Sequence, residues 1–370
     1  MMNPMEIETL EELDDHLEAG ASLRGVRLQR LDLRAYGDRL AEQGDLTGLV
    51  VLGGFVPPEV SDLLVRRGAI VFPGLEDAPI DPWRGLYLPE DLYAGLEGGY
   101  EATPDARAYA WSLEARVKTD AYCTLITAIH DDSVTDHLDE VLVGRSVVGV
   151  MGGHATLRGS ESYAAAARLG HALAESGHLV ATGGGPGAME AANLGASCPD
   201  EDVLAAAIDR LTAVPGFHPD VTAWARVALE VRHDVLDGEP QLPADVLGPT
   251  ARSVGIPTWF YGHEPPNVFC DVIAKYFSNA LREDGLLARS DGGVVILPGA
   301  AGTVQEIFQA LTPLYYAPDD VPISPLVLVG REYWTDGIPV WPLVQRLAKG
   351  RRMEGAVHLV DRLEDVVPLV

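Results

Sequence analysis

The sequence is poor in the residues that several common kinds of site require. Its 370 residues include three cysteines, Cys123, Cys198 and Cys270, which are far apart and form no C-x-x-C pair. An odd number of scattered cysteines indicates neither a disulfide framework nor a zinc site, and it suits a reducing compartment. Lysine is also rare, with three in the chain, so chemistry that needs a lysine Schiff base has few candidates here.

Positive charge is scarce as well. Against 27 lysines and arginines stand 55 acidic residues, a formal net charge of −28, and no basic run exceeds Arg351-Arg352. Because a chain this acidic repels nucleic acid and anionic membrane surfaces, we expect neither as a partner. No apolar run approaches the roughly 18–20 residues that cross a bilayer. The first twenty residues are acidic, unlike a secretory signal, and we expect a soluble cytoplasmic protein.

Three familiar signatures of nucleotide or acyl chemistry are also missing. No G-x-G-x-x-G follows a first strand, no G-x-x-x-x-G-K-[ST] occurs, and no G-x-S-x-G elbow is present. His130 and His137 stand seven residues apart in a polar cluster, which fits a solvated helix junction better than a metal site. We therefore expect no bound metal and no cofactor.

What the sequence does have is the composition of a globular protein. Apolar residues make up 47% of the chain and charged residues 22%, which is typical of proteins with a sizeable core. The length exceeds one ordinary domain of roughly 100–200 residues, so we expect two parts. We place the boundary near Glu140–Arg145. Residues 1–140 are predicted to be an N-terminal accessory α/β region, and residues 141–370 the main domain.

The main domain is predicted to begin with a strand, a helix and a parallel strand. Ser146–Met151 is a short β-rich apolar run, and Glu161–Ser176 is an alanine-rich helix with Ser160 as its N-cap. His178–Thr182 is the second strand. Strand, helix and strand at this spacing indicate a βαβ unit with a right-handed crossover.

Strands and helices continue to alternate after a polar stretch. Residues 197–251 are interpreted as a helical insertion. Further strands are predicted at Gly255–Tyr261, Gly293–Leu297 and Leu326–Gly330, and helices at Val268–Leu287 and Thr303–Tyr315. This order predicts an α/β protein with a doubly wound, mostly parallel, Rossmann-like sheet.

Unusual residues stand where four of these strands end. Ligands bind at the carboxyl ends of strands in such sheets. Glycine lets backbone N–H groups approach an anion, and a following helix adds its positive N-terminal end. The sequence therefore predicts a crevice for a phosphate-bearing ligand. The candidate binding residues are Gly152, Gly153, Gly183, Gly184, Gly185, Gly187, Asn267, Pro298, Gly299, Gly302 and Thr303.

One acidic residue follows the last of these loops. Glu306 lies one helical turn beyond Thr303, near the expected mouth of the crevice. Two interpretations are open for the pair. Either Thr303 faces a phosphate and Glu306 the ligand, or Thr303-x-x-Glu306 is a capping box that only begins the helix.

Two of the glycine loops, in this order, resemble the Lonely Guy family of nucleoside 5′-monophosphate phosphoribohydrolases, long mislabelled lysine decarboxylases. The family pattern G-G-G-x-x-G-x-M is matched in part at Gly183–Met189, and P-G-G-x-G-T-x-x-E at Pro298–Glu306. The resemblance covers about Arg145–Tyr316 without the insertion. It implies hydrolysis of the N-glycosidic bond of a nucleoside 5′-monophosphate, which releases free base and ribose 5-phosphate. It also implies a homodimer or a larger homo-oligomer.

The resemblance assigns roles to two side chains. Glu306 occupies the position of the family's catalytic glutamate, which stabilises positive charge on the ribose and activates water. The family's arginine lies about fifteen residues before its motif proline, a count that ends at Glu283, and we carry the role to the adjacent Arg282. The alternative interpretation of Arg282 is a solvated residue on a helix face.

Two features depart from the family pattern and leave alternatives open. Ala300 stands where the family has glycine, which matters if the position needs a positive φ. The segment His263-Glu264-Pro265-Pro266-Asn267, which compact members lack, is interpreted either as a recognition element for base or ribose or as a rigid proline turn. The alternative function is a nucleotide or phosphorylated-ligand sensor without turnover. A third hypothesis is a scaffold whose N-terminal region binds a protein.

Overall fold

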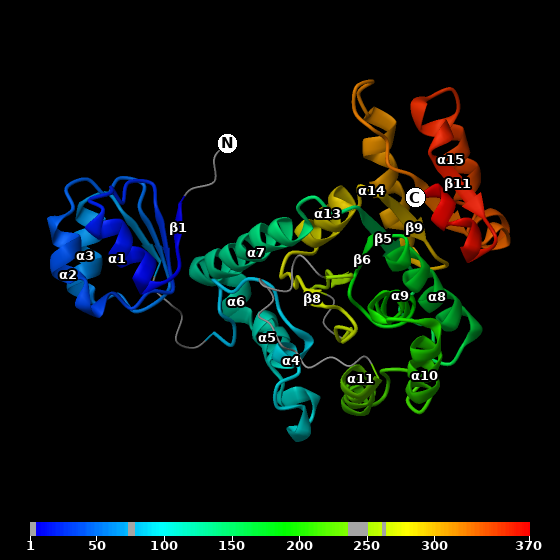
Figure 1. The fold of residues 1–370 in the computed structure, drawn as a ribbon, viewed down its shortest axis with the longest axis horizontal. Coiled ribbons are helices and arrows are strands. Elements are labelled where there is room, and N and C mark those ends of the chain that lie inside the picture. Colours follow the sequence, from blue (N-terminus) through cyan, green and yellow to red (C-terminus); the bar gives the residue numbers. More distant parts are fainter. Residues whose placement is uncertain (1–4, 73–77, 236–250, 261–263) are drawn as a thin grey trace. The chain divides into compact units, whose positions relative to one another are not determined.

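The computed structural model describes residues 5–72, 78–235, 251–260 and 264–370. The chain divides into two compact units, Met1–Arg84 and Gly85–Val370 (Figure 1). Each unit is built on its own parallel sheet, with helices in the connections between strands. The predicted α/β class is confirmed.

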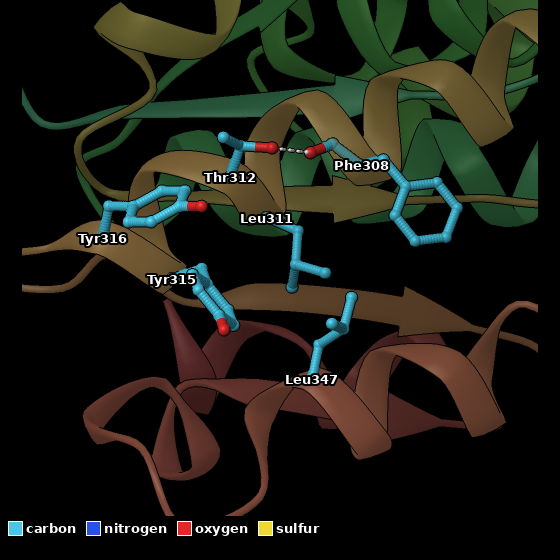
Figure 2. Close-up of a pocket in the computed structure, with 6 residues that line it drawn as sticks. All are labelled: Phe308, Leu311, Thr312, Tyr315, Tyr316 and Leu347. Carbon is cyan, nitrogen blue, oxygen red and sulfur yellow. Dashed lines mark hydrogen bonds between the residues drawn. The ribbon is translucent and has the colours of Figure 1, made fainter.

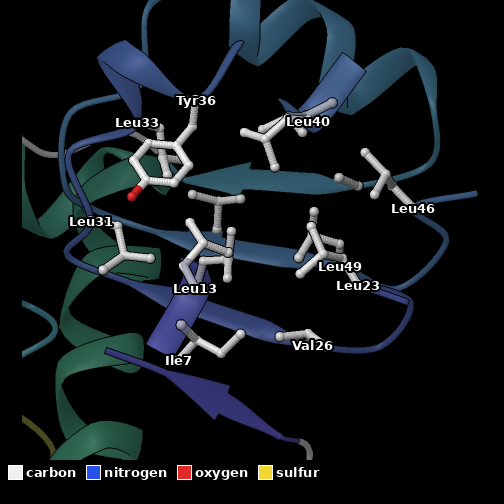
Figure 3. Packing of buried hydrophobic residues seen from close by; sticks show 14 of the residues in the cluster. Ile7, Leu13, Leu23, Val26, Leu31, Leu33, Tyr36, Leu40, Leu46 and Leu49 are labelled. Carbon is white, nitrogen blue, oxygen red and sulfur yellow. The ribbon is translucent and has the colours of Figure 1, made fainter. Parts of the chain in front are cut away.

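The first unit has a small sheet whose strands pair in sequence order. Within its described residues, β1 to β4 are all parallel. Leucines such as Leu13, Leu33 and Leu40 are fully buried beside this sheet (Figure 3). The elements are β1 (Glu6–Ile7), α1 (Leu10–Glu18), β2 (Arg27–Gln29), α2 (Gly37–Glu42), β3 (Val50–Leu52), α3 (Pro58–Arg66) and β4 (Ile70–Phe72).

The second unit contains the doubly wound sheet that the sequence predicts. Its described strands lie in the order β11-β10-β9-β5-β6-β7-β8, and every pair is parallel. The central strands read as continuous apolar runs because helices cover both faces of such sheets. The strands are β5 (Val147–Met151), β6 (Leu179–Thr182), β7 (Ser253–Gly255), β8 (Val272–Ile273), β9 (Gly293–Ile296), β10 (Leu326–Val329) and β11 (Val357–Val360).

The helices of the second unit connect and flank these strands. Ser160 caps the helix after β5 as predicted, since its side chain accepts a hydrogen bond from the N–H of Tyr163. The helices are α4 (Pro89–Leu92), α5 (Pro104–Leu113), α6 (Ala115–Thr119), α7 (Ala121–Leu142), α8 (Glu161–Glu175), α9 (Ala188–Ser197), α10 (Glu201–Leu211), α11 (Val221–Val235), α13 (Asn279–Arg289), α14 (Ala301–Tyr316) and α15 (Trp341–Ala348).

The boundary between the units differs from the predicted one. It falls at Arg84–Gly85 rather than near residue 140, because the segment that follows residue 84 is bonded to the large sheet. Tyr87 exchanges backbone hydrogen bonds of 2.8 Å with Ile273 of β8. The Nζ of Lys275 lies 2.5 Å from the carboxylate of Asp105, and both side chains are buried. Residues 85–142 therefore belong to the main domain.

One predicted helix is partly wrong. The expected helix over Val268–Leu287 contains β8 in its first half, and α13 begins only at Asn279. Val272 pairs with Val254 of β7, so this apolar run is a buried edge strand. A short apolar run fits a strand or a helix equally well by its periodicity, and only the pairing with β7 decides.

The longest described helix, α7, has 22 residues, yet it carries charged side chains throughout its second half. Among the described helices, none is both long and apolar enough to span a bilayer.

Candidate functional site

The loops at the carboxyl ends of β5, β6 and β9 meet at one edge of the large sheet. The chain adds β6, β7 and β8 on one side of β5 and then returns to add β9, β10 and β11 on the other, so the strand order reverses at β5. The N–H of Gly153 donates to the carbonyl of Pro298 (3.1 Å), and the N–H of Ala188 donates to the carbonyl of Gly153 (3.2 Å). The three predicted loops thus converge at the switch point, where doubly wound sheets bind their ligands.

Close approach of these loops depends on glycine at two positions. Gly187 has φ +75°, and a Cβ there would lie 2.6 Å from the carbonyl oxygen of Gly153. At Gly183, a Cβ would lie 2.3 Å from the Nη2 of Arg282. Side chains at either position would push the loop away from its neighbours. Gly152, Gly184 and Gly185 are buried in the same group of loops.

Asn267 holds the glycine loop in place. Its backbone N–H donates to the carbonyl of Gly184 (2.8 Å), and its Nδ2 donates to the carbonyl of Gly185 (3.1 Å) and to the Oδ1 of Asn193 (3.1 Å). Because the Asn267 side chain is fully buried and already bonded, it positions the loop rather than facing the crevice. His263, from the same predicted segment, lies outside the described residues.

The loop after β9 leads directly into α14. The N-cap is Ala300, with φ −94°, so this position does not need the conformational freedom of glycine. Within the described residues, no side chain caps α14, which leaves its first N–H groups for other acceptors. Thr303 is the third helical residue and not the N-cap, so the capping-box interpretation is wrong. The hydroxyl of Tyr333 donates to the carbonyl of Gly299 (2.8 Å) and fixes the loop.

Along this loop, Pro298 and Gly302 are exposed, whereas Gly299 and Thr303 are buried. A Cβ at Gly302 would have no heavy atom within 4 Å. The first turn of α14 is therefore open to a ligand at Gly302.

Glu306 and Arg282 lie side by side. The Nη1 of Arg282 is 3.9 Å from the Oε1 of Glu306, and their side chains are 10% and 13% exposed. The Nε of Arg282 donates to the carbonyl of Ile256 (2.8 Å) and its Nη2 to that of Gly183 (3.4 Å). Arg282 is thus a buried link between the glycine loop and Glu306, and the solvated interpretation is wrong.

Burial controls the electrostatics of Glu306. Desolvation raises the pKa of its carboxyl to about 7, although Arg282 opposes the shift. Glu283 and Glu264 raise the pKa further through their negative charge. The Oε2 of Glu283 accepts a hydrogen bond from the Nε2 of Gln305 (2.6 Å). Near neutral pH, Glu306 can therefore exist in both protonation states, as a group that exchanges protons requires.

The sequence interpretation missed a histidine at this edge. His154 follows Gly153 directly, and its Nδ1 lies 3.1 Å from the Oε1 of Glu264. Their side chains are 50% and 25% exposed. The position of His154, immediately after a glycine pair at a strand's carboxyl end, was the available signal. Its pairing with Glu264 joins residues too far apart in sequence to be inferred.

A pocket of about 290 Å³ lies elsewhere on α14 (Figure 2). Its lining comes from the middle and the end of α14 and from α15, and includes Phe308, Tyr315 and Leu347. Phe308 is two residues, or about 200°, around the helix from Glu306, so the pocket and the carboxylate lie on opposite faces of α14. This pocket is not part of the crevice.

Two further groups of buried ionisable side chains in the second unit are paired with one another. Asp105 accepts hydrogen bonds from the Nε1 of Trp259 and the hydroxyl of Tyr100, both 2.8 Å, besides its pairing with Lys275. Arg158 and Glu190 form a fully buried ion pair. Among the described residues, no three His, Cys, Asp or Glu side chains gather closely enough to hold a metal ion.

A known family model matches the part of the chain that contains two of these glycine loops. Residues 145–201 match the model of the SLOG cluster4 family, and the SLOG superfamily includes LOG-like Rossmann proteins. The match spans β5 to the start of α10 and includes Gly152, Gly153 and the loop at Gly183–Gly187. It does not reach Arg282 or Glu306.

Curated proteins provide no match to the chain. One solved structure that resembles it is the molybdenum cofactor binding protein from the phototrophic bacterium Rippkaea orientalis. The two share 18% identity at a TM-score of 0.35, over 61% of this chain and 96% of that chain. Because this likeness is low, the assignment of the fold rests on the order of the strands in the sheet. The chain is thus a Rossmann-like α/β protein, and residues 145–201, which include two of the candidate loops, match the model of the SLOG cluster4 family.

Proposed function

We propose that this chain hydrolyses the N-glycosidic bond of a nucleoside 5′-monophosphate to free base and ribose 5-phosphate. The observation that carries the proposal is the position of Glu306, one turn from the uncapped start of α14 and 3.9 Å from Arg282. The same helix can bind a phosphate at its first turn and supply the carboxylate that the reaction needs. The resemblance to the Lonely Guy family supports the same assignment.

The start of α14 would hold the 5′-phosphate. Free N–H groups and the helix dipole favour an anion there, by a few tenths to roughly 2 kcal/mol. The open space at Gly302 allows a phosphate oxygen to approach the backbone. Since the phosphate does not react, its binding energy serves to position the ribose near Glu306.

The carboxylate of Glu306 would act on the ribose. Cleavage of the bond develops positive charge at C1′, which a nearby carboxylate stabilises, and the same group can accept a proton from the attacking water. Arg282 keeps part of the Glu306 population ionised at neutral pH, because its charge opposes the rise in pKa. Arg282 therefore positions and tunes the reacting group.

Replacement of Glu306 tests the proposal. Glu306→Gln keeps the shape of the side chain but removes the base, and it is expected to slow base release by about 10²–10⁴-fold. Glu161→Gln, at the exposed first residue of α8, is the matched control and should leave the rate unchanged. An unchanged rate in Glu306→Gln would contradict the proposed role.

A second candidate function is a sensor that binds the nucleotide without turnover. The small exposed fraction of Glu306, 13% of its side chain, favours this alternative because a ligand reaches little of the carboxylate. Calorimetry distinguishes the two. Tight binding of a monophosphate together with no release of base would select the sensor.

A further inference from the structure

The pair formed by His154 and Glu264 lies where a ligand's base could reach it. His154 comes from the loop after β5, at the switch point of the sheet, and half of its side chain is exposed. The Oε2 of Glu264 is 3.5 Å from where a Cβ would stand on Gly185. The pair therefore lies over the glycine loop.

Glu264 also links this pair to the proposed reacting group. Its negative charge contributes to the raised pKa of Glu306, so the two carboxyl groups interact electrostatically. A ribose held at Glu306 would bring its base toward Glu264 and His154.

The proposed reaction needs a proton donor that Glu306 does not supply. When the bond between C1′ and the base breaks, its electron pair goes to the base. A neutral purine leaves readily only when it is protonated, and general acid catalysis of this kind is typically worth about 10²–10⁴-fold. Glu306, which accepts a proton from water, cannot donate one in the same step.

We propose that His154 is the general acid that protonates the leaving purine, and that Glu264 is its positioning residue. The inference rests on the proposed nucleosidase function. The two nitrogens of imidazole lie on opposite sides of the ring, so the contact of Nδ1 with Glu264 directs Nε2 away from that carboxylate. A carboxylate partner also stabilises the protonated imidazole and fixes its orientation, as it does in other acid–base pairs.

The proposed hydrolysis consumes only the nucleotide and one water molecule. The bond between C1′ and N9 breaks, and its electron pair enters the purine ring as N7 takes the proton from the Nε2 of His154. Hydroxide from water adds to C1′, and the second proton of that water goes to Glu306. Transfer of a proton from Glu306 to His154 through solvent restores both groups.

A substrate that already carries the positive charge tests this role. Guanosine 5′-monophosphate needs protonation at N7, whereas 7-methylguanosine 5′-monophosphate does not. His154→Asn is expected to lower kcat/KM for the first substrate by about 10²-fold and for the second by less than about threefold. Glu264→Ala should show the same selectivity with a smaller loss, on the order of tenfold.

Two controls separate the causes of a lost rate. His178→Asn replaces a histidine whose Nδ1 lies 3.0 Å from the Oγ of Ser146, before the amino end of β6, and should change neither rate. Glu306→Gln should slow both substrates alike, because both need an activated water.

The outcomes distinguish this inference from the function on which it rests. Equal losses on both substrates in His154→Asn would mean that His154 is structural and would overturn its role as an acid. Wild-type protein that releases base from neither substrate would overturn the inference for purines. Release from other monophosphates that still depends on Glu306 would then leave the proposed function standing.

Discussion

At the scale of a single residue, the burial of Glu306 sets the pKa of its carboxyl group and so the pH range in which it can react. Its pKa is raised to about 7, and the proposed base is the ionised form. We therefore expect the acid limb of the pH–rate profile, along which the rate rises as Glu306 ionises, to have its midpoint near pH 7. A pH–rate profile between about pH 5 and 8.5 measures this, and a rate that does not depend on pH over that range would be inconsistent with the assignment.

The same pKa shift affects stability. A folded-state pKa of about 7, above the ordinary 4.5, means that the folded chain holds this proton more tightly than the unfolded chain. The resulting stability is complete below about pH 4.5 and is lost as the pH rises through about 7. Glu306→Gln, which cannot ionise, should be more stable than wild type by about 1–3 kcal/mol near pH 8. Urea denaturation near pH 8 and pH 4.5 tests it, and the gain should vanish at the lower pH.

Arg282 is expected to tune this titration. Its positive charge lowers the pKa of Glu306, so Arg282→Gln should raise that pKa further and move the pH–rate profile to higher pH by on the order of one unit. Arg289→Gln is the matched control on α13, since Arg289 pairs with Asp139 (2.6 Å) instead. A profile that stays in place in Arg282→Gln would show that Arg282 does not act on Glu306.

At the scale of elements, the site depends on how closely three loops approach one another. Gly187→Ala would put a Cβ 2.6 Å from the carbonyl oxygen of Gly153 in a backbone conformation with φ +75°. We expect a loss of at least about 2–3 kcal/mol in the free energy of unfolding. Gly355→Ala is the control, because a Cβ there meets no heavy atom within 4 Å and φ is not positive. Similar losses in both variants would argue against the close approach as the cause.

The sequence predicts the loops of this site better than the contacts between them. Glycines that follow apolar runs mark the carboxyl ends of β5, β6 and β9, and the order of strands and helices places these ends at one edge of the sheet. The role of Asn267 as a buried support and the pairing of His154 with Glu264 depend on contacts between distant segments. Such contacts follow from the folded sheet, and no local pattern encodes them. The edge strand β8 was missed for the same reason.

At the scale of the whole molecule, the division at Arg84–Gly85 predicts which part of the chain folds alone. A chain that begins at Gly85 keeps Asp105 beside Lys275 and the hydrogen bond from the hydroxyl of Tyr93 to the carbonyl of Pro266 (2.6 Å). It should fold and bind a monophosphate. A chain that begins at Val141 leaves Lys275 buried without its carboxylate, a loss of about 3–5 kcal/mol, and should not fold. Circular dichroism and thermal melting of both chains decide between this division and one near residue 140.

The proposed function requires one crevice to hold a 5′-phosphate at the start of α14 and to present the ribose to Glu306. The most direct measurement mixes the full-length wild-type protein with each common nucleoside 5′-monophosphate and quantifies the products by chromatography. Free base and ribose 5-phosphate are expected in equal amounts from at least one of them. Release of inorganic phosphate and nucleoside instead, or no product from any of them, would contradict it.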